Sequence, residues 1–144
     1  MGASDTERAV GYLVKRVQQS LRRRCDAALR PSELSMAQYA AMRALADHPE
    51  ASASELARLC FVTRQSLQDL LVGLRSAGYV RDAKVSPRGR VRSLELTPSG
   101  TKRLAAAHTA VMAVDSTMLQ GVSLSAQHQL AAVLIRCAEN LESD

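Results

Sequence analysis

Three arginines stand close together in the segment SPRGRVR, and their chemistry is the first notable feature of this sequence. Arg88, Arg90 and Arg92 fall within five residues, beside Pro87 and Gly89. A guanidinium group is planar, always charged and able to donate several hydrogen bonds, which suits phosphate groups. Proline and glycine together predict a turn, so the three side chains are expected on a loop. Ordinary solvation of a charged loop is the alternative.

A second group of polar residues opens the helix that we expect to begin after Thr63. Hydroxyls and the free N–H groups of a helix N-terminus suit phosphate, and Arg64 could reach phosphate or guanine. Glutamine can pair with adenine through two hydrogen bonds, whereas Asp69 could contact cytosine or hold an arginine in place. Ordinary solvated helix surface is the alternative for the glutamines. The group consists of Thr63, Arg64, Gln65, Ser66, Gln68 and Asp69.

Positive charge is concentrated around these two groups. Residues 52–97 contain eight basic and four acidic residues, whereas residues 31–51 contain one basic and three acidic residues. The whole chain carries a formal net charge of +5. A localised basic region indicates a polyanionic partner, and both groups would suit double-stranded DNA.

Several other classes of function lack their characteristic residues. The three histidines form no H-E-x-x-H motif, and there is no nucleophile elbow or phosphate loop, so an enzyme is not expected. The three cysteines form no C-x-x-C pair, so neither structural zinc nor a cofactor is expected. The longest apolar run, LAAVLI, is too short to span a membrane, and the N-terminus does not resemble a secretory signal. We therefore expect a cytoplasmic protein.

The elements that must hold the polar groups are mostly helices. Of the 144 residues, 47% are hydrophobic but only 3% are aromatic, which favours a helical core of Leu, Val and Ala. We expect a mainly α fold with a small β-hairpin. The expected helices cover residues 6–29, 35–48, 52–60, 63–77, 97–121 and 125–141, and the strands cover residues 79–85 and 91–97.

Local signals predict where the central helices begin and end. Ser35, Ser52 and Thr63 are of the N-cap type, Glu55 follows Ser52 at the capping-box spacing, and Gly78 suits a helix C-terminus. Two helices joined by a tight turn, the second with a polar outer face, predict a helix-turn-helix, and a basic hairpin behind them makes it a winged helix. The recognition helix would enter the major groove, while an arginine of the wing enters the minor groove.

The segments ELARLCFVTRQSL and R-x-R-x-L-x-L-T-P-x-G resemble the MarR family of winged-helix transcriptional regulators, and the resemblance extends over roughly residues 5–142. It implies an obligate homodimer on a pseudo-palindromic operator, usually a repressor, released by a small ligand or by oxidation. It also implies three regions. These are an N-terminal dimerisation helix at 1–34, the winged helix-turn-helix at 35–97 and C-terminal dimerisation helices at 98–144.

Two departures from the family pattern concern the DNA-binding region. Phe61 stands in the turn where many relatives carry Gly, so we expect a turn that is wider or is packed by the ring. Many relatives also carry Asp in the wing shortly before the arginine that enters the minor groove. Arg90 matches that arginine, but Arg88 replaces the Asp, so Arg90 needs another acceptor. Arg88 and Arg92 are then expected to contact phosphates.

The resemblance further implies a ligand cleft between the dimerisation helices and the DNA-binding region, where relatives bind small aromatic acids or phenols. His108 is the expected polar anchor. No residue identifies the compound, and each candidate could equally be a core or surface residue. The candidates are Tyr12, Tyr39, Met42, His108 and Met112.

Two alternatives remain open from the sequence. Some relatives sense peroxide through a cysteine near the start of the first helix, whereas Cys25 lies near its end, and Cys60 lies beside the DNA-reading turn. Oxidation of Cys60 would therefore act close to the DNA, although no thiolate-stabilising group is evident beside it; Cys137 gives no indication either way. The other alternative is an adaptor that uses the winged helix to bind only proteins, which would not need a basic wing.

Overall fold

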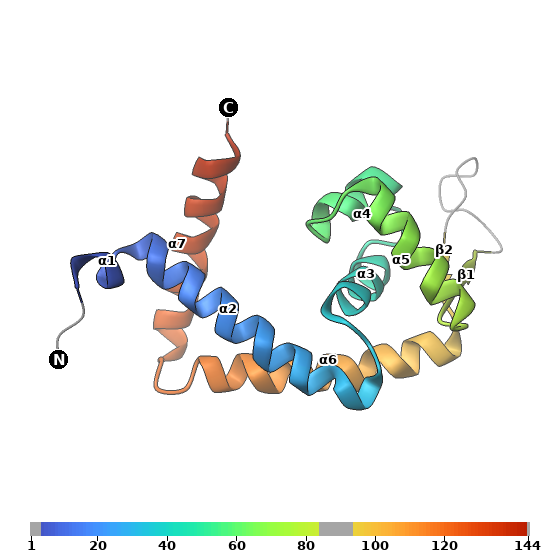
Figure 1. Cartoon of the computed structure of the whole chain (residues 1–144), viewed down its shortest axis with the longest axis horizontal. Helices are drawn as coiled ribbons and strands as arrows, with labels where there is room; N and C mark the ends of the chain where they lie inside the picture. The colour runs from blue at the N-terminus through green and yellow to red at the C-terminus, as the bar shows by residue number, and fades with distance from the viewer. Residues whose placement is uncertain (1–3, 84–93, 144) are drawn as a thin grey trace. The chain divides into compact units, whose positions relative to one another are not determined.

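The computed structural model describes residues 4–83 and 94–143 (Figure 1). Within these ranges the chain is mainly helical, with one antiparallel pair of strands, as the sequence predicts. It divides into two compact units, residues 1–114 and residues 115–144. The helices are α1 (Asp5–Arg8), α2 (Val10–Leu29), the 3-10 helix η1 (Arg30–Ser32), α3 (Met36–Asp47), α4 (Ala53–Leu59), α5 (Arg64–Ser76), α6 (Pro98–Met118) and α7 (Leu124–Glu142); the strands are β1 (Val80–Asp82) and β2 (Leu94–Leu96).

The three predicted N-caps of the central helices are confirmed. The Ser35 hydroxyl accepts a hydrogen bond from the Gln38 N–H at 3.0 Å, and the Ser35 N–H donates to the Gln38 side-chain oxygen at 2.9 Å. The Ser52 hydroxyl caps α4 by accepting from the Glu55 N–H at 3.1 Å, and the Thr63 hydroxyl caps α5 by accepting from the Ser66 N–H at 3.0 Å. Each cap satisfies an N–H group that the first helical turn leaves without an intrahelical partner.

Two helix boundaries differ from the prediction. The first helix is not continuous over residues 6–29, because Ala9 has an extended backbone (φ −65°, ψ 139°) that separates α1 from α2. The last helix begins after Ser123 rather than at Ser125, since the Ser123 hydroxyl accepts from the Ala126 N–H at 3.1 Å. Serine stands at both positions, and the extended backbone at Ser123 is what allows it to cap.

The core of the first unit lies where α2, α3, α5 and α6 meet. Its most deeply buried side chains include Leu29 of α2, Met42 of α3, and Leu67 and Leu74 of α5. Burial of these apolar surfaces is the main favourable contribution to folding. Leu104, Ala107 and Val111 complete the core from α6. The inner face of α5 is thus committed to the core, and its polar face is left exposed.

The hairpin is joined to the start of α6 by a compact set of contacts. Val80 pairs with Leu96, Arg81 with Glu95, and Asp82 with Leu94. The Thr97 N–H donates to the Tyr79 carbonyl at 3.0 Å, and the Thr97 hydroxyl donates to the Gly78 carbonyl at 2.6 Å. These bonds hold the base of the wing against the end of α5. Residues 84–93, which include most of the predicted wing, lie outside the described residues.

Candidate nucleic-acid interface

The N-terminus of α5 presents a row of exposed polar groups. The Thr63 hydroxyl accepts from the Ser66 N–H and donates to the Ser66 hydroxyl, both at 3.0 Å. Helix geometry leaves the N–H groups of Arg64 and Gln65 pointing out of the first turn, where the helix dipole favours an anion. This end of the helix can therefore bind a phosphate group.

Gln65 is held in place by Asp69, one helical turn further along α5. The Gln65 side-chain Nε2 donates to an Asp69 carboxylate oxygen at 3.1 Å, and both residues are exposed. The second Nε2 hydrogen and the amide oxygen remain free to meet the two groups that adenine presents in the major groove. The sequence predicted a contact of Asp69 with cytosine or with an arginine, but not this hydrogen bond with Gln65. The four-residue spacing could have indicated it, because such residues are neighbours on a helix.

Gln68 and Ser66 border different hollows beside α5. Gln68 lies at a pocket of about 260 Å³ lined also by residues of α3, α4 and β2. Ser66 and Asp69 border a hollow on the side of α3, together with Ala37 and Gln38. The exposed positions of α5 thus include Ser66, Gln68 and Asp69, whereas Leu67 between them is buried in the core. All six predicted residues, Thr63, Arg64, Gln65, Ser66, Gln68 and Asp69, are solvent-exposed.

Two ion pairs occupy the base of the wing. Arg75 of α5 contacts Asp82 of β1 at 3.1 Å, and Arg81 faces Glu95 across the strands at 3.8 Å. Each of these side chains is at least 40% exposed, so the pairs contribute little to stability. The Arg75–Asp82 pair connects α5 to the hairpin, whereas the Arg81–Glu95 pair lies within it. The predicted DNA contacts Arg88, Arg90 and Arg92 lie outside the described residues.

The turn between α4 and α5 is built around a left-handed residue. Phe61 has φ +57°, and the turn closes through hydrogen bonds from the Phe61 N–H to Arg58 and from the Val62 N–H to Ala57. The Phe61 side chain is 91% exposed, so the expectation that its ring packs the turn is wrong. The ring points outward because Val62, which packs against the core, takes the inner position.

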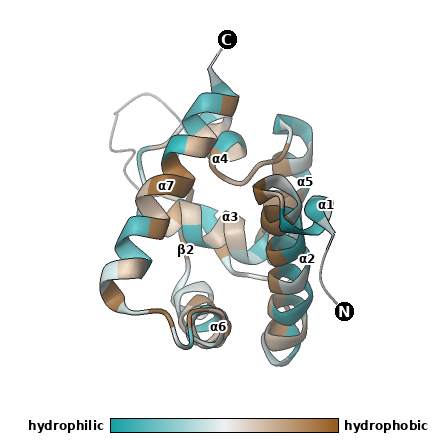
Figure 2. Cartoon of the chain, turned by 90° about the vertical axis from the view of Figure 1, so that its left-hand side faces the viewer, coloured by the Kyte–Doolittle hydropathy of each residue, from teal (hydrophilic) through white to brown (hydrophobic). Residues whose placement is uncertain are grey.

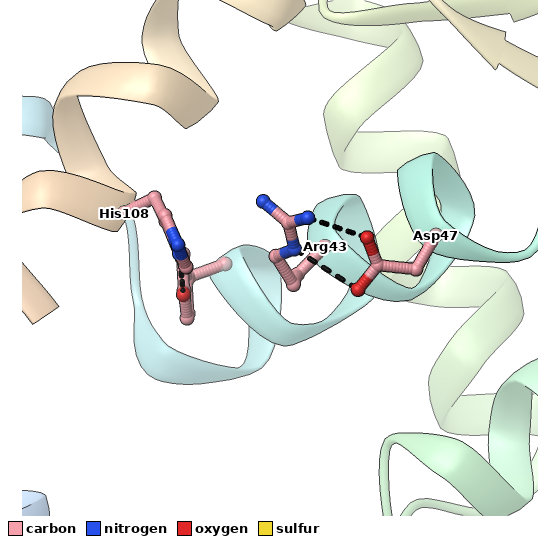
Figure 3. Close-up of polar contacts among 4 residues, drawn as sticks. Arg43, Asp47 and His108 are labelled. Atoms are coloured by element: carbon pink, nitrogen blue, oxygen red, sulfur yellow. Dashed lines mark hydrogen bonds and ion pairs between the residues drawn. The ribbon is translucent and has the colours of Figure 1, made fainter. Parts of the chain in front are cut away.

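A polar cluster joins α3 to α6 within the first unit (Figure 3). The Tyr39 hydroxyl and His108 Nδ1 share a hydrogen bond of 2.8 Å, and the two rings are stacked. Arg43 and Asp47 follow Tyr39 at four-residue intervals on α3, and Arg43 Nε donates to Asp47 at 3.0 Å. This hydrogen bond lowers the pKa of Asp47 and raises that of Arg43. Sequence reasoning selected the ring pair but missed Arg43, which the same spacing could have indicated.

The remaining ligand candidates are placed differently. Met42 is completely buried in the core, whereas Tyr12 and Met112 are 46% and 41% exposed. The structure therefore brings together Tyr39 and His108, while Met42 lies in the core of the first unit. Among the described residues there is no group of three or more His, Cys, Asp and Glu side chains that could hold a metal ion.

Two of the three cysteines are removed from solvent. Cys25 and Cys60 are both buried. Burial raises the pKa of the Cys60 thiol, because the charged form loses its hydration. A redox-sensing cysteine needs the opposite change, a lowered pKa on an accessible thiol. The structure thus gives no support to oxidation of Cys60 as the switch.

In the described part of the chain, no helix is both long and apolar enough to cross a membrane.

Comparison with known proteins agrees with this geometry. The model of the MarR family matches residues 32–90. The HTH-type transcriptional repressor Rv2887 of Mycobacterium tuberculosis is 35% identical over 145 residues, and the match covers all of both proteins. This chain belongs to the MarR family.

Solved MarR family structures support the winged-helix assignment. The complex of Mycobacterium tuberculosis Rv2887 with DNA has a TM-score of 0.69 and 31% identity, over 94% of this chain and 98% of that chain. The complex of Rv2887 with salicylic acid has a TM-score of 0.70 and 30% identity, over 90% and 96% respectively. In the MarR fold of the present chain, α4 and α5 form the helix-turn-helix, and β1 and β2 form the base of the wing.

Proposed function

We propose that this protein is a transcriptional repressor that binds a pseudo-palindromic operator as a homodimer in the cytoplasm and leaves it when a small aromatic acid binds. One observation carries the proposal. A chain similar over its full length to a named repressor holds a row of exposed polar groups at the start of its recognition helix. Rv2887 itself has been solved with DNA and with salicylic acid, which supports both parts of the proposal.

Two kinds of contact with DNA are assigned to the helix-turn-helix. Thr63, Ser66 and Arg64 position the protein on phosphates, because hydroxyls, N–H groups and guanidinium groups suit charged oxygens. Gln65 and Gln68 read base edges, and Asp69 holds the Gln65 amide in its reading orientation. In the wing, Arg90 enters the minor groove, whereas Arg88 and Arg92 contact phosphates.

Two apolar faces that the single chain leaves exposed support the proposed homodimer. Val10, Val14 and Val17 of α2 are each at least 47% exposed. The described residues of α7 include none that is buried, although the helix carries Leu130, Val133, Leu134 and Ile135. Figure 2 shows hydrophobic residues along both helices. Faces of this kind mark association surfaces, and a second copy of the chain offers matching ones.

The Tyr39–His108 pair is the proposed anchor of the ligand. A phenol and an imidazole that already share a hydrogen bond can each bond to the carboxylate or hydroxyl of a small aromatic acid. Tyr12 and Met112 supply exposed apolar surface for the aromatic ring, and Met42 supports α3 from the core. Binding here acts on α3, which packs against α5, so it can alter the position of the recognition helix.

The test has two stages. Genomic fragments are selected with the purified protein, and the affinity for the enriched fragment is then measured by fluorescence anisotropy with and without salicylate. The proposal predicts an enriched pseudo-palindrome and weaker binding in salicylate, with a smaller salicylate effect in His108→Ala. Equal affinity for the enriched fragment and a scrambled duplex would refute DNA-sequence recognition. An unchanged affinity in salicylate would refute only this class of ligand.

A further inference from the structure

Phe61 combines two features that are unfavourable in the free protein. Its backbone is left-handed, with φ +57°, a conformation that residues with a Cβ avoid for steric reasons. Its phenyl ring is 91% exposed, although aromatic rings usually contribute large buried areas. A residue held in a strained conformation is a reason to look for a function at that position.

The ring stands next to the proposed DNA-reading end of α5. Phe61 lies two residues before the N-cap Thr63, so the two Cα atoms are at most about 7 Å apart. Beyond Val62, the residues Thr63 to Ser66 are all polar and exposed. The turn itself is closed by backbone hydrogen bonds and by Val62 packing against the core, so the ring is not needed to hold the turn.

We propose that Phe61 reads the C5-methyl group of a thymine at the edge of the major groove. The inference rests on the proposed function, in which the start of α5 enters that groove. The thymine methyl is the apolar group that base pairs present there, and phenylalanine is among the residues that contact it. Contact with DNA would bury the exposed ring, whereas the neighbouring polar groups bind phosphates and base edges. The basic character of this region favours DNA over a protein as the occupant of this surface.

The test removes the methyl group and the ring separately. The probe is the duplex that the wild-type protein selects from a randomised pool, and each thymine is replaced in turn by deoxyuridine, which lacks only the methyl. In the wild type, each half-site should contain one thymine whose single replacement weakens binding by about fourfold, the effect of losing one buried methyl group. In Phe61→Gly, which suits the left-handed backbone, that replacement should have no effect.

Two further variants complete the experiment. Phe61→Leu retains apolar bulk and should keep part of the thymine effect. Val72→Ala alters another exposed apolar residue of α5, 64% exposed and two turns beyond its start, and should keep all of it. A methyl effect of equal size in wild type and Phe61→Gly would overturn the inference. A uniform loss in Phe61→Gly on all duplexes, with no thymine effect in the wild type, would also overturn it. If the wild type selects no sequence, the proposed function fails as well.

Discussion

Gln65 does not move freely on the surface of α5, because its amide donates a hydrogen bond to Asp69. In the proposed complex with DNA, this bond would lower the entropic cost of reading a base, because it already restricts the rotation of the Gln65 side chain. Gln68, three residues further along, lies beside a pocket lined mostly by apolar side chains. The two glutamines thus have different surroundings on α5.

The proposed base contacts of the two glutamines lead to a prediction at the residue scale. Replacing Gln65 or Gln68 by Ala should relax base preference at a particular position by about 1–3 kcal/mol for each lost pair of hydrogen bonds. Asp69→Ala should weaken the Gln65-dependent preference without abolishing it, since the amide can still reach the base. Affinities for operators that differ by single base pairs measure the effect. If either glutamine variant weakens binding equally on every sequence, that glutamine positions the protein on the DNA instead of reading a base.

At the scale of elements, the base of the wing depends on a close approach between two segments. The first turn of α6 lies against the backbone of Tyr79, the residue just before β1. Gly100 lies in the first turn of α6, and a Cβ added there would stand 2.1 Å from the Tyr79 carbonyl oxygen, a backbone atom that cannot rotate away. Arg103, one turn further along, packs over the Tyr79 ring and donates to the Ser32 carbonyl at 2.8 Å. Only glycine permits this approach.

Gly100→Ala should therefore lower the free energy of unfolding by about 3 kcal/mol, as expected when a side chain is forced into a packed site. Gly73→Ala is the matched control, because a Cβ at Gly73 of α5 meets nothing within 4 Å. It should raise the free energy of unfolding by about 0.5–1 kcal/mol through the better helix propensity of alanine. Urea denaturation of both variants gives the comparison. Equal changes in the free energy of unfolding would show that the Tyr79 backbone does not exclude a Cβ at position 100.

The wing arginines allow a prediction that separates charge from shape reading. Arg90→Ala should cost more affinity on an operator with A·T-rich flanks than on one with G·C-rich flanks, because narrow minor grooves attract arginine. Arg92→Ala should cost the same on both, and each variant should lower the slope of log affinity against log salt by about one unit per charge in each half of the dimer. Salt titrations on the two operators test this. Equal flank dependence would mean that the wing supplies charge only.

The elements were largely predictable because their signals are local. The caps at Ser35, Ser52 and Thr63 involve residues three positions apart, and the periodicity of α5 is contained within one helix. The break at Ala9 and the exposed ring of Phe61 were not predicted, because neither residue type signals its conformation. In the candidate site, exposure of the polar face of α5 was predicted, whereas the Arg43–Asp47 pair beside Tyr39 was missed.

At the scale of the whole molecule, the proposed homodimer would cover apolar side chains of α2 and α7 that are exposed in the single chain. Leu13 of α2 and Leu134 of α7 are 38% and 44% exposed, and Leu141 is 88% exposed. Two-fold symmetry would present a recognition helix to each half of a pseudo-palindrome. In the proposed homodimer, the second copy would serve both stability and recognition, since two linked half-sites bind far more tightly than one.

The wild-type protein should accordingly sediment at micromolar concentration with twice the 15.6 kDa mass of the chain. Leu134→Asp should shift this equilibrium toward the monomer, because a charge would be buried in an apolar contact. It should also weaken operator binding by about 10²-fold or more, since the half-sites would bind independently. Gln129→Asp, at an exposed polar position of the same helix, is the control and should remain dimeric. A wild type that sediments as a monomer would refute the dimeric architecture, and a dimeric Leu134→Asp would remove α7 from the interface.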